Sequence, residues 1–290
     1  MALASSKPDD LGAAWLAAAH GGDCAAAWAI NDAVLAARDP ATRDDAGRPY
    51  HERWVWDGRP LRGRALVRCY HGLGDTLQFW RYVGALAEQA DVVVEVQPSL
   101  LSLLAGAVPL LPFDPARPAP PRHDIEIMEL AHALRLPPSP APYLHADPMV
   151  LSLPRPIIGV CWAAWGMDAA RSVPWPMLQR LNGLGTAVSL QRGVADAPWP
   201  DPLHGTMEVA ATARLIAACD HVVTVDTMVA HLAGALGRPV SLLLKADADW
   251  RWMRGRNDSP WYGSMRLYRQ PAPGDWATPI GQLLRDMEDL

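Results

Sequence analysis

Short apolar runs alternate along the chain with stretches of helical spacing. A first series has apolar runs at 64–70 and 91–96, with a helical pattern at 76–88 between them. A second series has apolar runs at 157–161, 187–190, 221–225, 240–244 and 265–268, with helical patterns at 209–219, 228–236 and 280–290. Near-continuous apolar runs are typical of parallel strands that are covered on both faces. The pattern therefore predicts an α/β protein with two Rossmann-like domains that face a cleft.

The residues before the first strand have helical spacing instead. Residues 10–38 are rich in alanine, with a turn at His20-Gly21-Gly22-Asp23 and an end at Asp39-Pro40. This short helical hairpin resembles one degenerate tetratricopeptide unit. A single unit cannot bury its own apolar face, so we expect the hairpin to pack on the domain that follows it.

Prolines mark the expected domain boundary. Thirteen of the 28 prolines lie between residues 109 and 156, a density that long regular elements do not tolerate. We therefore predict a helical hairpin at 1–45, a first α/β domain at 46–145 and a second at 146–290, with the linker at 137–156.

Composition and charge narrow the classes of function. Half of the 290 residues are hydrophobic and the net charge is −5, which excludes a wholly disordered chain and argues against a dedicated nucleic-acid binder. Charged residues interrupt the longest apolar stretch, 221–244, and residues 1–10 have no apolar core, so neither a transmembrane segment nor a signal peptide is predicted. The four cysteines have no close spacing, which fits reduced thiols in a cytoplasmic protein without a zinc site.

The turn after the first strand is the first candidate site. Gly72 and Gly74 surround Leu73 and precede Asp75, so the backbone can approach a ligand closely. The turn is not a dinucleotide fingerprint. Asp75 is interpreted either as a helix N-cap or as a residue that takes part in chemistry.

The second candidate follows the strand at 221–225. Asp226 ends the strand, Thr227 can cap the next helix, and the amides of Thr227, Met228 and Val229 could bind an anion. His231 lies one turn into the helix and could reach the same anion. A capped helix with a buried core histidine is the alternative interpretation.

Three weaker candidates also follow predicted strands. Arg171, in the loop 162–172, could bind a diphosphate in a bidentate manner, or it could be a solvated surface arginine. Gln191 could bind a base or sugar hydroxyls. The aromatic residues of 249–262 could stack on a sugar or base, but packing of this segment onto the second domain is the favoured interpretation.

Taken in order, these segments resemble glycosyltransferase family 9, the heptosyltransferase-like group with the GT-B fold. The resemblance covers roughly residues 50–290. It rests on G-L-G-D at 72–75, I-G-V-C-W at 158–162, S-L-Q-R-G at 189–193 and V-D-T-M-V-A-H at 225–231. The motifs D-W-R-W, S-P-W-Y and M-R-L-Y-R-Q look like the branch of this family that carries tetratricopeptide repeats.

The resemblance implies an inverting transfer of a sugar from a nucleotide-diphosphate donor to a glycan or protein hydroxyl, without a metal cofactor. Asp75 would be the general base. Asp226 would bind sugar hydroxyls, and the other donor-binding residues would be Arg171, Gln191, Thr227, Met228 and His231. The first α/β domain would bind the acceptor and the second the nucleotide sugar.

The sequence departs from the family pattern at two places. Met228 stands where family members often have glycine, and the loop 163–171 lacks the expected run of asparagine and lysine. A nucleotide-sugar-binding protein without turnover, acting through its helical hairpin, is therefore the alternative. A nucleotide-sugar epimerase is disfavoured because the chain has neither G-x-G-x-x-G nor a Tyr-x-x-x-Lys pair.

Overall fold

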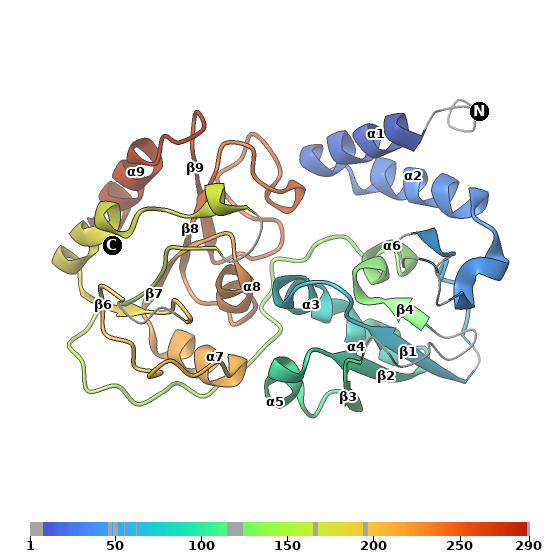
Figure 1. Cartoon of the computed structure of the whole chain (residues 1–290), viewed down its shortest axis with the longest axis horizontal. Coiled ribbons are helices and arrows are strands. Elements are labelled where there is room, and N and C mark those ends of the chain that lie inside the picture. Colours follow the sequence, from blue (N-terminus) through green and yellow to red (C-terminus); the bar gives the residue numbers. More distant parts are fainter. Residues whose placement is uncertain are drawn as a thin grey trace. The chain divides into compact units, whose positions relative to one another are not determined.

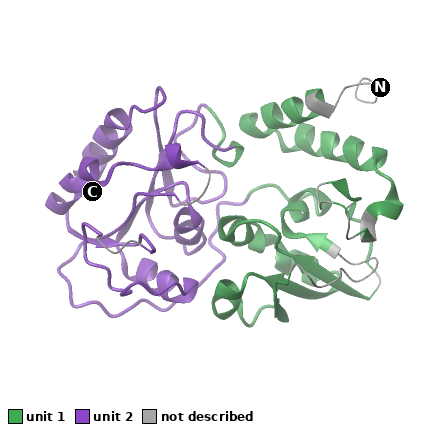
Figure 2. Ribbon diagram, viewed as in Figure 1, with its two compact units in different colours: residues 1–138, 250–254 green, residues 139–249, 255–290 purple. Residues whose placement is uncertain are grey.

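The computed structural model describes residues 8–45, 48, 52–54, 56–61, 63–114, 124–164, 168–193 and 197–288. The chain divides into two compact units (Figure 2). Unit 1 is Met1–Pro138 with Trp250–Arg254, and unit 2 is Ser139–Asp249 with Gly255–Leu290. The change of unit after Pro138 falls in the proline-rich stretch. The three-part division into 1–45, 46–145 and 146–290 is finer than these two units and stays a prediction.

Unit 1 begins with two helices, α1 (Pro8–Gly21) and α2 (Cys24–Ala37). Gly22 between them has a φ of +74°, a left-handed conformation that glycine adopts without strain. The Asp23 carboxylate caps α2 by accepting a hydrogen bond from the Ala26 amide at 2.9 Å. A 3-10 helix, η2 (Pro40–Asp44), follows α2.

The sheet of unit 1 has four parallel strands in the order β3-β2-β1-β4 (Figure 1). Its strands are β1 (Arg64–Arg68), β2 (Asp91–Val96), β3 (Leu110–Pro112) and β4 (Asp124–Glu126). β1 and β2 lie where the apolar runs predicted them. β3 was not predicted, because a strand of three residues with a proline has no clear hydrophobic pattern.

The predicted helix at 76–88 is three short elements. These are α3 (Leu73–Phe79), η4 (Trp80–Tyr82) and α4 (Val83–Ala87). Two further pairs of short helices follow the later strands. η5 (Pro98–Leu100) and α5 (Leu101–Leu104) follow β2, and η6 (Ile127–Glu129) and α6 (Leu130–Ala133) follow β4. Helix α3 begins three residues earlier than predicted because Gly72, not Asp75, is its N-cap.

The sheet of unit 2 has five parallel strands in the order β6-β5-β7-β8-β9. Its strands are β5 (Ile157–Cys161), β6 (Thr186–Ser189), β7 (His221–Val225), β8 (Val240–Leu244) and β9 (Met265–Arg269). All five lie within one residue of the predicted runs at each end. The chain order reverses between β5 and β7, and ligands of open α/β sheets bind at the carboxyl ends of strands at such a switch point.

Helices cover the sheet of unit 2 (Figure 1). They are η7 (Ala169–Arg171), η8 (Trp175–Gly183), α7 (Val209–Ala218), α8 (Met228–Ala235) and α9 (Ala277–Glu288), and η9 (Trp250–Trp252) belongs to unit 1. One apolar core joins β5 and β7 to η8 and α9, with Leu178, Leu181 and Leu283 almost completely buried. This core holds the strand ends of the candidate site in place.

Candidate functional site

The carboxyl ends of β5, β6 and β7 are tied together by side chains. The Gln191 carboxamide oxygen, just beyond β6, accepts a hydrogen bond from the Ala163 amide at 2.9 Å. It also lies 3.5 Å from the Cys161 sulfur, which is 3.7 Å from the Thr227 hydroxyl. The structure thus brings Gln191 and Thr227 to the predicted edge of the sheet. Gln191 is buried and fixes the start of the loop after β5, while its role toward a base or sugar stays a prediction.

Thr227 caps helix α8, as the sequence predicts. Its φ of −146° is extended, and its hydroxyl accepts the Val229 amide at 3.3 Å. The expectation that the Val229 amide is free for an anion is therefore wrong. Met228 is the first residue of the helix, and the amide at that position has no partner within a helix. The helix start keeps the positive end of the helix dipole and at least this amide for an anion.

Two cations lie beside this helix start. Arg171 donates from Nη1 to the Asp226 carbonyl at 3.0 Å, and its Nε lies 3.8 Å from the Asp168 carboxylate. The Lys245 ammonium is 2.8 Å from the same Asp168 oxygen. The hydrogen bond and the charge of Lys245 hold the pKa of Asp168 below its ordinary value. The Arg171 and Lys245 side chains are 29% and 27% exposed, so a ligand in solution can reach both.

Sequence reasoning missed Lys245 as a site residue. The signal was present, because Lys245 directly follows a buried strand and is one of only two lysines in the chain. Residues 165–167, within the loop 163–171 that departs from the family pattern, lie outside the described residues.

His231 is buried inside unit 2. Its Nδ1 lies 2.9 Å from the Tyr262 hydroxyl, and the two rings meet edge to face with centroids 5.9 Å apart. These contacts give His231 the packing role of the alternative interpretation, and its contact with a diphosphate stays a prediction. Asp226 is also buried, at 8% exposure, and its role toward sugar hydroxyls stays a prediction as well.

Asp75 is the third residue of α3. One oxygen of its carboxylate accepts a hydrogen bond from the Gly72 amide at 3.0 Å. The N-cap is Gly72, so the interpretation of Asp75 as the N-cap is wrong. The other oxygen lies 2.5 Å from Nη2 of Arg251, and Nε of Arg251 donates to Gln78 at 2.7 Å. The Asp75 side chain is 26% exposed and Arg251 only 11%. Gly72 is the N-cap of α3 and Gly74 is its second residue, so the predicted glycine turn is the start of this helix. The acidic side chain there has two protein partners.

A second group of polar residues ends the strands of unit 1. Glu126, the last residue of β4, is buried, and desolvation raises its pKa well above the ordinary value. Its carboxyl lies 3.9 Å from the half-exposed ring of His71, which directly precedes the glycine turn. The chain order of this sheet reverses between β1 and β4, so these residues stand at its switch point.

The aromatic segment 249–262 divides between the units. Trp250 packs edge to face on Trp15 of α1, with centroids 5.1 Å apart, and the Arg251 guanidinium lies 4.8 Å from the Trp250 ring centre. Trp261 and Tyr262 are buried in unit 2. The expectation that the whole segment packs onto the second domain is therefore wrong for Trp250, because α1 offers an aromatic surface to it.

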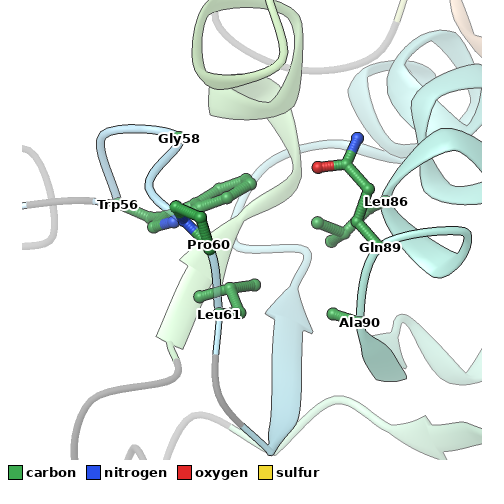
Figure 3. A pocket seen from close by; sticks show the side chains of 7 residues that line it. All are labelled: Trp56, Gly58, Pro60, Leu61, Leu86, Gln89 and Ala90. Atoms are coloured by element: carbon green, nitrogen blue, oxygen red, sulfur yellow. The ribbon is translucent and has the colours of Figure 1, made fainter.

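A small pocket of about 90 Å³ lies elsewhere in unit 1 (Figure 3). Trp56, Pro60 and Leu61 face Leu86 and Gln89 across it. It contains none of the candidate residues, and Gln89 brings a polar side-chain amide to its lining. The described residues contain no group of three His, Cys, Asp or Glu side chains able to hold a metal, and no helix long and apolar enough to cross a membrane.

Part of this chain matches a family model. The model of glycosyltransferase family 9 (heptosyltransferase) matches residues 186–246, a segment that contains Gln191, Asp226, Thr227, Met228, His231 and Lys245. FlbA of Caulobacter vibrioides is 25% identical over 81% of this chain and 48% of its own. The chain therefore spans about half the length of that curated relative.

Solved structures of heptosyltransferases share the fold. ADP-heptose lipopolysaccharide heptosyltransferase II of E. coli is 18% identical, with a TM-score of 0.55 over 79% of this chain and 99% of the enzyme. A family 9 glycosyltransferase from Veillonella parvula is 10% identical, with a TM-score of 0.57 over 80% of this chain and 98% of that one. The iron-containing dodecameric glycosyltransferase TibC of enterotoxigenic E. coli is 15% identical, with a TM-score of 0.54 over 78% of this chain and 66% of TibC. The parallel α/β fold is thus the fold of GT-B heptosyltransferase structures.

Proposed function

We propose that this chain is an inverting glycosyltransferase that moves a sugar from a nucleotide-diphosphate donor to a hydroxyl of a glycan or protein. One observation carries the proposal. Arg171 is bonded to the carbonyl of Asp226 at the start of α8, so a guanidinium, a helix dipole and the Met228 amide meet at the switch point of the unit 2 sheet. The family 9 match to residues 186–246 supports the same assignment.

In this proposal the diphosphate binds at the start of α8. The Thr227 hydroxyl and the Met228 amide donate to phosphate oxygens, and Arg171 neutralises the charge that grows on the leaving nucleoside diphosphate. These groups carry the charge without a metal, so excess EDTA should leave nucleotide affinity unchanged. The ADP-heptose bound to TibC supports a nucleotide sugar as the donor class.

Asp75 is the proposed general base. Its carboxylate would accept the proton of the acceptor hydroxyl while that oxygen attacks the anomeric carbon and the bond to the diphosphate breaks. The fixed position of Asp75, set by Gly72 and Arg251, supports this role because a base must be held in a defined orientation.

A binding protein without turnover remains the second candidate, and Met228 is the observation in its favour. The side chain of Met228 stands at the helix start, where family members often have glycine, and it narrows the approach to the Met228 amide. Product analysis separates the two candidates, because only a transferase releases nucleoside diphosphate in step with glycosylation of an acceptor.

Calorimetric titration tests the donor site directly. Arg171→Ala should weaken the binding of a nucleoside diphosphate about tenfold or more, because a charge-assisted hydrogen bond contributes about 1.5–3 kcal/mol. Arg180→Ala is the matched control, since Arg180 is an exposed arginine of the same unit that pairs with Glu288. Equal affinity in the Arg171 variant, the control and the wild type would contradict the proposed site.

A further inference from the structure

Lys245 is a cation that the proposed function does not yet use. We propose that Lys245 is a second diphosphate-binding cation, and that Asp168 is an internal anion that leaves Lys245 and Arg171 when a diphosphate binds. This inference rests on the proposed function, because it assumes that the ligand carries a diphosphate. The juxtaposition of the three side chains is what carries it.

Shared contacts place Lys245 near the start of α8. Lys245 directly follows β8 and pairs with Asp168, which also lies beside Arg171. Arg171 in turn donates to the carbonyl of Asp226, the residue before the N-cap Thr227. A lysine there adds a positive charge to the end of α8 that already carries the positive pole of the helix dipole. Its ammonium can bind phosphate as a point charge.

Asp168 is shared by both cations. One of its oxygens lies 2.8 Å from the Lys245 ammonium and 3.8 Å from Nε of Arg171. The Asp168 carboxylate thus lies between two cations, and a bound diphosphate would pair with the same two cations. The Arg171 Nε is buried without a hydrogen-bond partner among the described residues, so this nitrogen keeps a donor for an incoming oxygen.

The ion pairs of Asp168 are easy to exchange. The Asp168 side chain is 38% exposed, and ion pairs with such exposure contribute little to stability because water screens them. A diphosphate carries more negative charge than one carboxylate and offers several acceptor oxygens, so it competes well for the same two cations. Asp168 therefore lowers the affinity for the diphosphate without preventing its binding.

A structural role for the pair makes the opposite prediction. If Lys245 and Asp168 only fasten the loop 162–172 to the end of β8, then removing the Asp168 charge loosens Arg171 and weakens nucleotide binding. If Asp168 competes with the ligand, removing its charge strengthens binding. The sign of the effect of Asp168→Asn therefore distinguishes the two roles.

The experiment measures the dissociation constants of ADP and of inorganic pyrophosphate by calorimetry with the full chain. Pyrophosphate has no nucleobase or ribose, so a substitution that acts on diphosphate binding must change the dissociation constants of both probes. Lys245→Ala should weaken binding about tenfold, and Asp168→Asn should strengthen it about two- to fivefold. Lys245→Gln, which keeps most of the side chain, should behave like Lys245→Ala, and Arg180→Ala should match the wild type.

Four outcomes decide between the proposals. If the wild type binds the probes and both Lys245 variants bind them equally well, the inference about Lys245 is wrong and the proposed donor site stands. Weaker binding by Asp168→Asn would assign the pair the structural role and also overturn it. A wild type that binds neither probe would overturn the proposed donor site, and the inference with it. Weaker binding in both Lys245 variants with stronger binding in Asp168→Asn would establish it.

Discussion

The contact between Asp75 and Arg251 predicts how the first unit responds to a single substitution. Asp75→Asn removes the negative charge while keeping the shape of the side chain and one acceptor oxygen. That oxygen can still accept the Gly72 amide, so the contribution to the start of α3 changes by only a few tenths of a kcal/mol. The loss then falls on Arg251, whose guanidinium keeps its bond to Gln78 but loses its anionic partner.

The size of that loss follows from burial. Hydrogen bonds to charged groups contribute about 1.5–3 kcal/mol, and exposed ion pairs about 0.2–1 kcal/mol. The side chains of Arg251 and Asp75 are 11% and 26% exposed, so the pair lies between these two cases. We therefore expect Asp75→Asn to lower the free energy of unfolding by about 1–2 kcal/mol.

A double-mutant cycle in urea checks this value. Wild type, Asp75→Asn, Arg251→Gln and the double variant should give a coupling free energy of about 1–2 kcal/mol. Asp258→Asn is the control, because its carboxylate pairs with Arg256 but is 66% exposed, and it should change stability by less than about 0.5 kcal/mol. A coupling below about 0.3 kcal/mol would refute the reasoning that Arg251 holds Asp75 in place.

The same variant tests the proposed chemistry once an acceptor is known. Loss of a general base typically slows a reaction about 10²- to 10⁴-fold. Asp75→Asn should therefore nearly abolish transfer while leaving nucleoside diphosphate affinity unchanged. Transfer close to the wild-type rate would leave Asp75 with a structural role only.

Three further predictions concern unit 2 and the thiols. Burial lowers the pKa of His221 from 6.5 to about 4, so the unfolded chain takes up this proton at a higher pH than the folded protein does. The stability that His221 contributes is therefore complete above pH 6.5 and is lost as the pH falls toward 4. Between pH 7 and pH 5, the free energy of unfolding of the wild type in denaturant melts should fall by about 2 kcal/mol more than that of His221→Asn. Gly234→Ala would put a Cβ 2.4 Å from the Tyr262 ring and should cost about 1–3 kcal/mol, whereas Gly84→Ala, with open space around it, should be neutral or stabilising. Burial raises the pKa of Cys219 to about 12 and also raises the pKa of Cys69 and of Cys161. A thiol reagent at pH 8 should therefore label only the partly exposed Cys24 in the folded protein. Rapid labelling of a second thiol would contradict this prediction.

The strands β5, β7 and β8 of unit 2 could be predicted because each is a mostly apolar, buried run between polar turns. The start of α3 could not, because an aspartate ahead of a helical pattern fits the N-cap and the third helical position equally well. Here Gly72 is the N-cap, and glycine carries no side-chain signal for that role. The break at Trp80–Tyr82 was missed for a related reason, since its large buried residues keep the spacing of a continuous helix.

The strand-end positions of Gln191, Asp226 and Thr227 could also be predicted, because parallel strands bring their carboxyl ends to one edge. The partners of the charged residues could not be predicted from the sequence. Arg251 reaches Asp75 across 176 residues of sequence, and such a pairing depends on how the chain folds back rather than on any local pattern. His231 was ambiguous for the same reason, because only the fold shows that Tyr262 supplies its hydrogen-bond partner.

The short segment after β8 supplies a cation to each candidate region. Lys245 lies beside Asp168 in unit 2, and Arg251, six residues later, holds Asp75 in unit 1. Each cation therefore pairs with one acidic residue that has a role in the proposals: Asp168 would compete with the donor diphosphate, and Asp75 would accept the proton of the acceptor hydroxyl. The two roles predict different defects, so nucleotide affinity should respond to substitution of Lys245 but not of Arg251, and transfer at saturating donor should respond to Arg251. A substitution of Arg251 that weakened nucleotide binding as strongly as one of Lys245 would show that this separation is wrong.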